Sequence, residues 1–217
     1  GNKMIGFIKK DLMIVKANTK VGLVVLAMLL AISLQGGNAD AIAVLPIIGL
    51  MLFLGTFSYD EMSRWNAYAV TMPGGRRNAV AAKYVASFLL CLVLAVFAGV
   101  LISVVRLVLN ETFSIGDVAA LVVGGFFGTS LTMAFLYPLM IKWGALNGRI
   151  ALFALFMAVG CFGYLASEFL PDESVQRVLH VINGNDVMTG VVLAGLTVVS
   201  LVVSYLVSNK IYSKKEF

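Results

Sequence analysis

Residues 84–109 read YVASFLLCLVLAVFAGVLISVVRLVL and contain one charged side chain, Arg106, near the end of the run. A helix that crosses a bilayer needs about 20 consecutive, mostly apolar residues, and this run meets that length. It lacks the alternation of apolar and polar residues that the strands of a membrane β-barrel show. The stretch therefore predicts a membrane-spanning helix.

The composition of the whole chain agrees with a lipid environment. The 217 residues are 60% hydrophobic and 12% charged, with a mean hydropathy of +0.97, whereas about a quarter of the residues of a soluble domain are charged. Cys91 and Cys161 both fall in apolar runs, so we interpret them as small core residues rather than a disulfide or a metal site. We expect one membrane domain over residues 1–217, with no room for a soluble catalytic domain.

Six apolar runs have the length and composition of membrane spans, which predicts an all-α, polytopic membrane protein. The runs cover about residues 19–35, 41–58, 84–109, 118–141, 150–169 and 187–208. An even number of spans places both termini on one side of the membrane. Every Lys and Arg except Arg106 and Arg177 falls on that side, and this bias predicts that it is cytoplasmic.

Two segments outside the spans have an amphipathic pattern. In residues 1–18 an apolar stripe recurs at helical spacing, and lysines lie beside it; its members are Met4, Ile5, Ile8, Leu12 and Val15. We expect an interfacial helix on the inner leaflet, acting as a basic anchor, a contact for a cytoplasmic partner, or both.

The pattern of residues 171–184 predicts an extracellular amphipathic helix. It contains the single histidine, His180, which lacks the partners of a catalytic or metal site.

The segment between the second and third predicted spans concentrates polar and aromatic residues. Tyr59, Met62 and Trp65 share one helical stripe with Tyr68 or Ala69, and a helix is expected over residues 59–75, ended by Pro73-Gly74-Gly75. Asp60 and Arg64 have the i, i+4 spacing of a helical ion pair. Acidic residues at a cytoplasmic membrane face oppose anionic lipid, so the Asp60-Glu61 pair favours a protein partner. The alternative is an ordinary basic loop with aromatic anchors.

The order of residues in this segment is more specific than its composition. It reads Phe57-x-x-Asp60-Glu61, then Trp65, Tyr68, Thr71-Met72-Pro73, Arg76, Val80 and Lys83-Tyr84. This pattern over residues 57–84 resembles the loop after the second span in permease subunits of type-2 class ABC (ATP-binding cassette) exporters. It looks closest to the branch that pairs with a separate ATPase chain to export peptides, such as bacteriocins and phenol-soluble modulins.

The resemblance implies a function and a set of contacts. The helix after the second span would be a coupling helix that sits in a groove of the ATPase. The implied interface residues are Tyr59, Asp60, Glu61, Met62, Arg64, Trp65, Tyr68, Thr71, Met72, Pro73, Arg76 and Arg77. Arg76, Arg77 and Lys83 would pair with the coupling acids or lipid phosphate, or would only set topology.

The resemblance also implies the partners and the location. The expected partners are two copies of an ABC ATPase subunit, a second permease subunit in a homo- or heterodimer, the lipid bilayer, and a peptide or other amphipathic cargo; no nucleic acid is expected. The transport path would lie between the two permeases, lined by the first, second and fifth spans. The expected location is the inner or plasma membrane of a bacterial cell.

Missing sequence features exclude several other functions. The chain has no G-x-x-x-x-G-K-[ST] motif, so ATP and Mg are expected on the partner ATPase, and no enzyme activity, cofactor or metal is expected here. The spans are almost free of ionisable residues, which ion-coupled carriers use. Two alternatives stay open: a scaffold or immunity-type protein that binds a peptide or lipid without an ATPase, and a membrane enzyme using Ser130 or His180. Gly124-x-x-x-Gly128 predicts close helix packing.

Overall fold

The computed structural model describes residues 2–72, 75–110, 114–169 and 186–214, and every element in this part of the chain is helical. In chain order the elements are α1 (Asn2–Ala17), α2 (Thr19–Gly36), the short 3-10 helix η1 (Asp40–Val44), α3 (Leu45–Met62), α4 (Trp65–Thr71), α5 (Gly75–Val108), α6 (Ile115–Trp143), α7 (Ala145–Phe169) and α9 (Asp186–Lys214). The predicted all-α fold is confirmed. The predicted helix over 171–184, with His180, lies outside the described residues.

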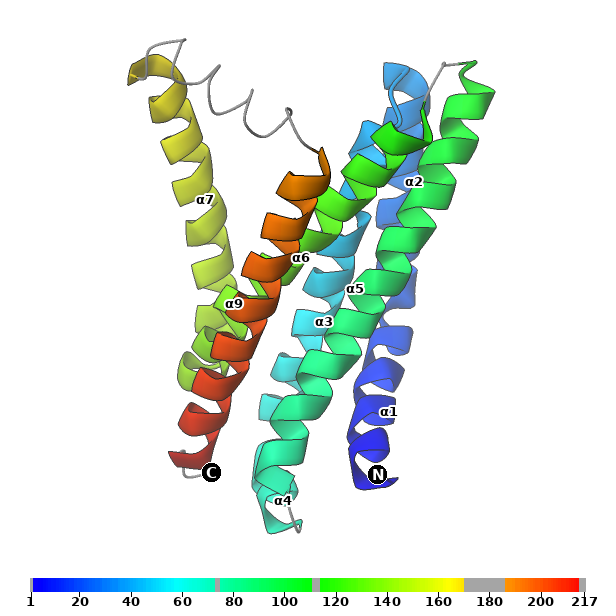
Figure 1. Ribbon diagram of the computed structural model, residues 1–217. Helices are drawn as coiled ribbons and strands as arrows, with labels where there is room; N and C mark the ends of the chain where they lie inside the picture. Colours follow the sequence, from blue (N-terminus) through cyan, green and yellow to red (C-terminus); the bar gives the residue numbers. More distant parts are fainter. Residues whose placement is uncertain (1, 73–74, 111–113, 170–185, 215–217) are drawn as a thin grey trace.

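Six helical segments within the described residues are long and apolar enough to cross a membrane. They are Thr19–Gly36, Asp40–Met62, Arg77–Val108, Ile115–Trp143, Ala145–Phe162 and Gly190–Lys214. The predicted count of six is therefore confirmed. Both chain ends lie at the same end of the helix bundle, and α4 lies at its tip (Figure 1). We call this end the base and the opposite end the top.

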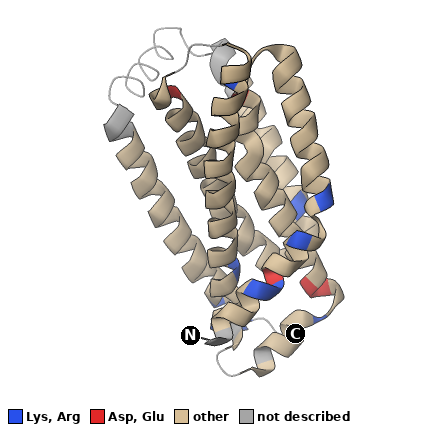
Figure 2. Ribbon diagram, turned by 90° about the vertical axis from the view of Figure 1, so that its right-hand side faces the viewer, with Lys and Arg blue, Asp and Glu red and all other residues tan. Residues whose placement is uncertain are grey.

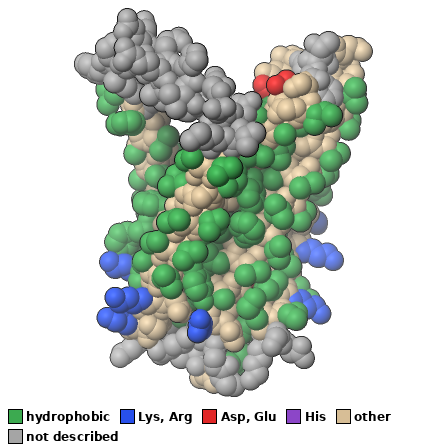
Figure 3. Space-filling model, viewed as in Figure 1, with side chains coloured by type: hydrophobic (Ala, Val, Ile, Leu, Met, Phe, Trp, Pro, Cys, Tyr) green, Lys and Arg blue, Asp and Glu red, His purple; other side chains and the backbone are tan. Residues whose placement is uncertain are grey.

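The surface has the composition expected of a lipid-facing bundle. Apolar side chains cover its flanks, and Lys and Arg side chains gather toward the base (Figure 3). The second view shows the same bias, with most charged residues in the lower part of the bundle (Figure 2). The chain is therefore a multi-pass membrane protein.

Two apolar clusters hold the bundle together. The cluster nearer the base centres on Tyr137 of α6, whose ring lies edge-on to Phe57 (5.1 Å between centroids) and Tyr84 (4.9 Å) and is stacked with Phe53 (6.4 Å). The cluster nearer the top joins η1, α3, α5 and α6 through small and branched residues such as Ala98 and Ile102. In lipid these contacts act through close packing, because lipid tails are as apolar as the side chains.

Local sequence explains several helix boundaries. Ser114 accepts a hydrogen bond from the Asp117 amide, and the Asp117 carboxylate accepts one from the Ser114 amide, which is a capping box at the start of α6. Gly37 ends α2 in a left-handed conformation (φ 63°). The packing prediction for Gly124 and Gly128 is not met among the described residues, because a Cβ at either position would contact none of their atoms. Gly125 is the close contact, since a Cβ there would lie 2.6 Å from the Ala43 carbonyl oxygen.

Candidate functional site

The segment that follows the second span folds as two helical pieces. α3 continues to Met62, and α4 begins at Trp65 after Arg64 adopts a left-handed conformation (φ 52°). A single helix over 59–75 was predicted, and this break is a departure from it. The Ser63 hydroxyl donates to the Tyr59 carbonyl (2.7 Å) in the last turn of α3, and such back-bonding weakens a helix. The result is a short helix at the tip of the base (Figure 1).

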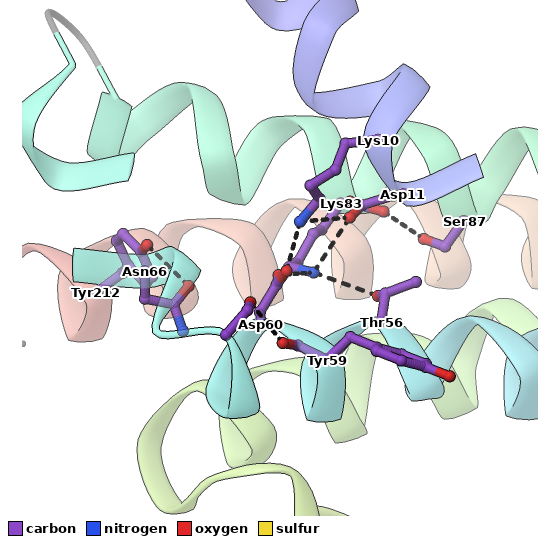
Figure 4. Close-up of polar contacts among 10 residues, drawn as sticks. Lys10, Asp11, Thr56, Tyr59, Asp60, Asn66, Lys83, Ser87 and Tyr212 are labelled. Carbon is purple, nitrogen blue, oxygen red and sulfur yellow. Dashed lines mark hydrogen bonds and ion pairs between the residues drawn. The ribbon is translucent and has the colours of Figure 1, made fainter. Parts of the chain in front are cut away.

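Four charged side chains meet behind α4, in what we call the charged cluster: Lys10 and Asp11 from α1, Asp60 from α3 and Lys83 from α5 (Figure 4). Lys83 Nζ lies 2.7 Å from Asp60 Oδ2 and 3.7 Å from Asp11 Oδ1. Lys10 Nζ lies 2.9 Å from Asp11 Oδ1 and also pairs with Asp60. The Lys83 ammonium donates to Thr56 Oγ1 (3.2 Å). The cluster therefore joins three helices that are far apart in sequence.

Burial makes these pairs interdependent. Asp11 is 1% exposed and Asp60 is 2% exposed, so water does not solvate their charges, and each carboxylate depends on the two ammonium groups. The two positive and two negative charges balance. Aromatic faces add to the stabilisation of the cations: Lys83 Nζ lies 4.3 Å from the centre of the Phe57 ring, and Lys10 Nζ lies 4.9 Å from that of Trp65.

The face of α1 that packs against the bundle differs from the predicted stripe. Phe7 and Asp11 are buried, with Met4, Ile8 and Val15 partly buried beside them, whereas Ile5 and Leu12 are exposed. Asp11 was not singled out from the sequence. Its position four residues after Phe7 and four before Val15, in the middle of an apolar stripe, was the signal that it is buried and paired.

Two side chains of α4, Trp65 and Asn66, contact α1 and α9. The Trp65 ring packs edge-on against Phe7 of α1 (6.1 Å between centroids). The Tyr212 hydroxyl of α9 donates to Asn66 Oδ1 (3.2 Å). Neither Asn66 nor Tyr212 was singled out in the sequence. α4 therefore contacts α1 and α9 directly, and it reaches the charged cluster through Lys10.

The twelve residues predicted to contact an ATPase occupy different environments. The surface residues are Tyr59, Glu61, Met62, Arg64, Tyr68, Thr71 and Arg77; Trp65 and Met72 are half-buried, and Asp60 is buried. Pro73 and the side chain of Arg76 lie outside the described part. Asp60 does not pair with Arg64 as predicted, because its carboxylate is held by Lys10 and Lys83. Its burial withdraws Asp60 from any surface contact, while the interface as a whole stays a prediction.

Glu61 has a structural contact that the sequence did not reveal. Its Oε1 accepts a hydrogen bond from the Ala145 amide (2.8 Å), the first amide of α7. A carboxylate at a helix N-terminus satisfies a free amide and interacts favourably with the helix dipole. Gly144, with φ 90°, lets the chain pass close to this carboxylate. Glu61 therefore fixes the start of α7 to the end of α3.

The structure gives little support for a ligand, metal or catalytic site elsewhere in the described residues. A cavity of about 30 Å³ lies beside the charged cluster, between Phe57, Trp65 and Tyr212, which is the scale of a single water molecule. Among the described residues no group of three or more His, Cys, Asp or Glu could hold a metal ion. Ser130 is buried in α6, and its hydroxyl has no hydrogen-bond partner among the described residues. At the top, Arg106 pairs with Asp40 of η1 (2.6 Å), a contact that the sequence did not predict.

The fold and the base together define a class: a six-span, all-α membrane protein with a short helix at the end that holds both termini. A family model described as "ABC-2 family transporter protein" matches residues 6–213, nearly the whole chain. The chain belongs to this family and is the membrane-spanning permease subunit of an ABC transporter, so the family implies an ABC ATPase as its partner. The comparisons with curated proteins and with solved structures gave no match.

Proposed function

We propose that this permease exports an amphipathic or hydrophobic cargo, with a peptide as the first candidate, from a bacterial cell. In this proposal the segment around α4 receives the motion of a separate ABC ATPase. The observation that carries it is the exposure of large apolar side chains at the tip of the base: Met62 is 84% exposed and Tyr68 is 57% exposed. Aromatic and Met side chains are typical of the centres of protein interfaces.

The orientation follows from the distribution of charge. Nearly all basic residues are on the side of the two termini, and the positive-inside rule makes that side cytoplasmic. α4 would then lie where an ATPase can reach it. The basic and apolar side chains of α1 would face the inner leaflet of the bacterial plasma membrane.

The charged cluster gives the proposed coupling its physical basis. Force applied to α4 acts on α1 through Trp65 and Phe7, and on α9 through Asn66 and Tyr212. Because Asp60 and Lys83 are paired in a buried setting, α3 and α5 would move with α1 rather than slide past it. A displacement at the base would thus reach several membrane-spanning helices together.

The number of subunits, the transport path and the ATP site in this proposal follow from ATP-driven transport by a paired ATPase. Closure of two ATPase subunits around ATP would need two permease subunits, either identical or different, with the transport path between them. ATP and Mg would bind the ATPase. Spans that carry few ionisable side chains suit a cargo with a large apolar surface.

The structure sharpens the test of the ATPase contact. Glu61 and Trp65 also stabilise the fold, so their variants would confuse coupling with folding. The exposed pair Met62→Ala/Tyr68→Ala is the better change, and Met13→Ala on α1, which is 58% exposed, is the matched control. We expect the double variant to weaken binding of the cognate ATPase about 30-fold, as for a loss of about 2 kcal/mol at an interface centre.

The measurement is the affinity of the ATPase for the purified, reconstituted permease. Unchanged affinity in the double variant would show that α4 is not the contact. If the wild-type permease binds no ATPase at all, the scaffold or immunity-type alternative replaces the exporter. If the ATPase does bind, the cargo class can be identified by comparing how strongly candidate peptides and lipids stimulate ATP hydrolysis by the complex.

A further inference from the structure

An apolar groove runs between α5 and α9 on the flank of the bundle, close to the base. Its volume is about 410 Å³, within the range of small-molecule sites. Met133 of α6 is buried beneath it, while Val85, Leu89 and Val202 at its rim are exposed. The further lining residues are Ala81, Tyr84, Phe88, Leu201 and Tyr205. The groove therefore opens outward from two membrane-spanning helices.

The polar atoms near the groove are bonded within the protein. The Tyr84 hydroxyl hydrogen-bonds with Ser204 (2.6 Å) and Ser208 (2.8 Å), and the Ser204 hydroxyl donates to the Ala134 carbonyl. The rings of Tyr84 and Tyr205 meet edge-on, with 5.7 Å between their centroids. A peptide backbone in this groove would find no hydrogen-bond partner at Tyr84, whereas a hydrocarbon chain needs none.

A cationic side chain lies at the base end of the groove. Arg77 precedes Ala81 by four residues and Tyr84 by seven, which places it on the same stripe of α5. It is exposed, and it forms no ion pair with the described residues. The acids nearby are engaged elsewhere: Asp11 and Asp60 by lysines, and Glu61 by the start of α7. The positive charge at the mouth of the groove is thus available to an anion.

The position of the groove along α5 matches the boundary of a bilayer leaflet. The 34 residues of α5 span about 51 Å, which exceeds the roughly 30 Å of bilayer hydrocarbon. The first turns of α5 must then stand at the level of the lipid headgroups, with Arg77 among them. From Ala81 to Leu89 the groove extends about 12 Å along the helix toward the hydrocarbon.

We propose that this groove binds an anionic phospholipid, with one acyl chain between α5 and α9 and the headgroup phosphate at Arg77. The acyl chain supplies the apolar contact, and Arg77 supplies the charge that distinguishes an anionic headgroup from a zwitterionic one. The site requires no ATPase, so it does not depend on the proposed coupling role of α4.

The test uses native mass spectrometry of the purified permease, which counts bound lipids and copies of the chain together. The probes are phosphatidylglycerol and phosphatidylcholine with the same palmitoyl and oleoyl chains. We expect the wild-type chain to retain phosphatidylglycerol preferentially. Arg77→Gln should lower that retention about fivefold and lower the retention of phosphatidylcholine less, because the choline cation offsets the charge of its phosphate. Lys210→Gln removes a charge from the base end of α9, about 140° around the helix from Tyr205. It should not change the retention of either lipid.

A second variant addresses the groove itself. Val202→Phe adds volume at an exposed rim position, so it should lower the retention of both lipids without unfolding the chain. The proposal is overturned if Arg77→Gln and Lys210→Gln have equal effects, or if Val202→Phe retains both lipids like the wild type. It is also overturned if glycerol 3-phosphate, which has no acyl chains, displaces the lipid. Conversion of dimers to monomers by Val202→Phe would instead make the groove a contact between copies.

Discussion

Replacing Lys83 by methionine gives the sharpest test of the charged cluster. Methionine keeps most of the length of the side chain but removes the ammonium group 2.7 Å from Asp60 and 3.7 Å from Asp11. The two buried carboxylates would then share Lys10 alone, leaving one negative charge uncompensated. Removing one partner of a buried ion pair costs about 3–5 kcal/mol, and we expect a loss of stability of that size for Lys83→Met.

Thermal unfolding of the purified permease in detergent, followed by the fluorescence of Trp65 and Trp143, measures this loss. For a chain of this length each kcal/mol lowers the unfolding midpoint by about 2–4 °C, so the midpoint should fall by on the order of 10 °C. Lys210→Met is the matched control, because Lys210 is exposed and surface substitutions usually change stability by less than about 0.5 kcal/mol.

A second substitution separates charge imbalance from simple loss of packing. In Lys83→Met/Asp60→Leu the cluster keeps Lys10 and Asp11, and its charges balance again. Neutralising both partners of a buried pair is often nearly neutral for stability, so the double variant should recover most of the loss. The reasoning is refuted if Lys83→Met is as stable as Lys210→Met, or if the double variant is less stable than the single one.

Three further variants probe other contacts, in the same unfolding assay unless stated. Glu61→Ala removes the acceptor for the first amide of α7 and should cost about 1 kcal/mol, with Glu61→Gln, which keeps an acceptor, as its control; equal losses would contradict the capping role. Gly75→Ala places a Cβ within 1.7 Å of the Ala69 carbonyl oxygen, so the junction of α4 and α5 must shift, and limited proteolysis should become faster there than in wild type. Arg106→Gln should cost less than about 1 kcal/mol, because its partner Asp40 remains 45% solvent-exposed in the pair; a larger loss would contradict that estimate.

The sequence was sufficient for the membrane architecture because that architecture depends on local composition. Each span needs about 20 apolar residues, whatever lies elsewhere in the chain. The start of α6 is equally local, since Ser114 and Asp117 satisfy each other's backbone amides within one turn. The charge distribution predicted which loops share one end of the bundle, and the structure places both termini at one end.

The contacts of the candidate site were harder to predict from the sequence, because they join distant parts of the chain. Asp11 stands out in the sequence as a charge in an apolar stripe, but only folding brings Lys83 of α5 to it. The break at Arg64 was missed because the residues from Tyr59 to Tyr68 have a continuous helical pattern, and the later Pro73 is the stronger helix-breaking signal. Local periodicity cannot show that α4 turns away from α3 to pack against Phe7.

The adjacent acids Asp60 and Glu61 show how a pattern can be located correctly while its contacts are misjudged. Successive residues of a helix point about 100° apart, so the two carboxylates at the end of α3 face different neighbours. Asp60 binds lysines of α1 and α5, and Glu61 holds the start of α7. The pair therefore fastens three other helices to the end of α3, next to the short helix that we propose contacts the ATPase. An acidic pair serving this purpose needs no partner protein to explain it, so the case for the ATPase contact rests on Met62 and Tyr68, whose exposed apolar surfaces nothing in the described chain covers.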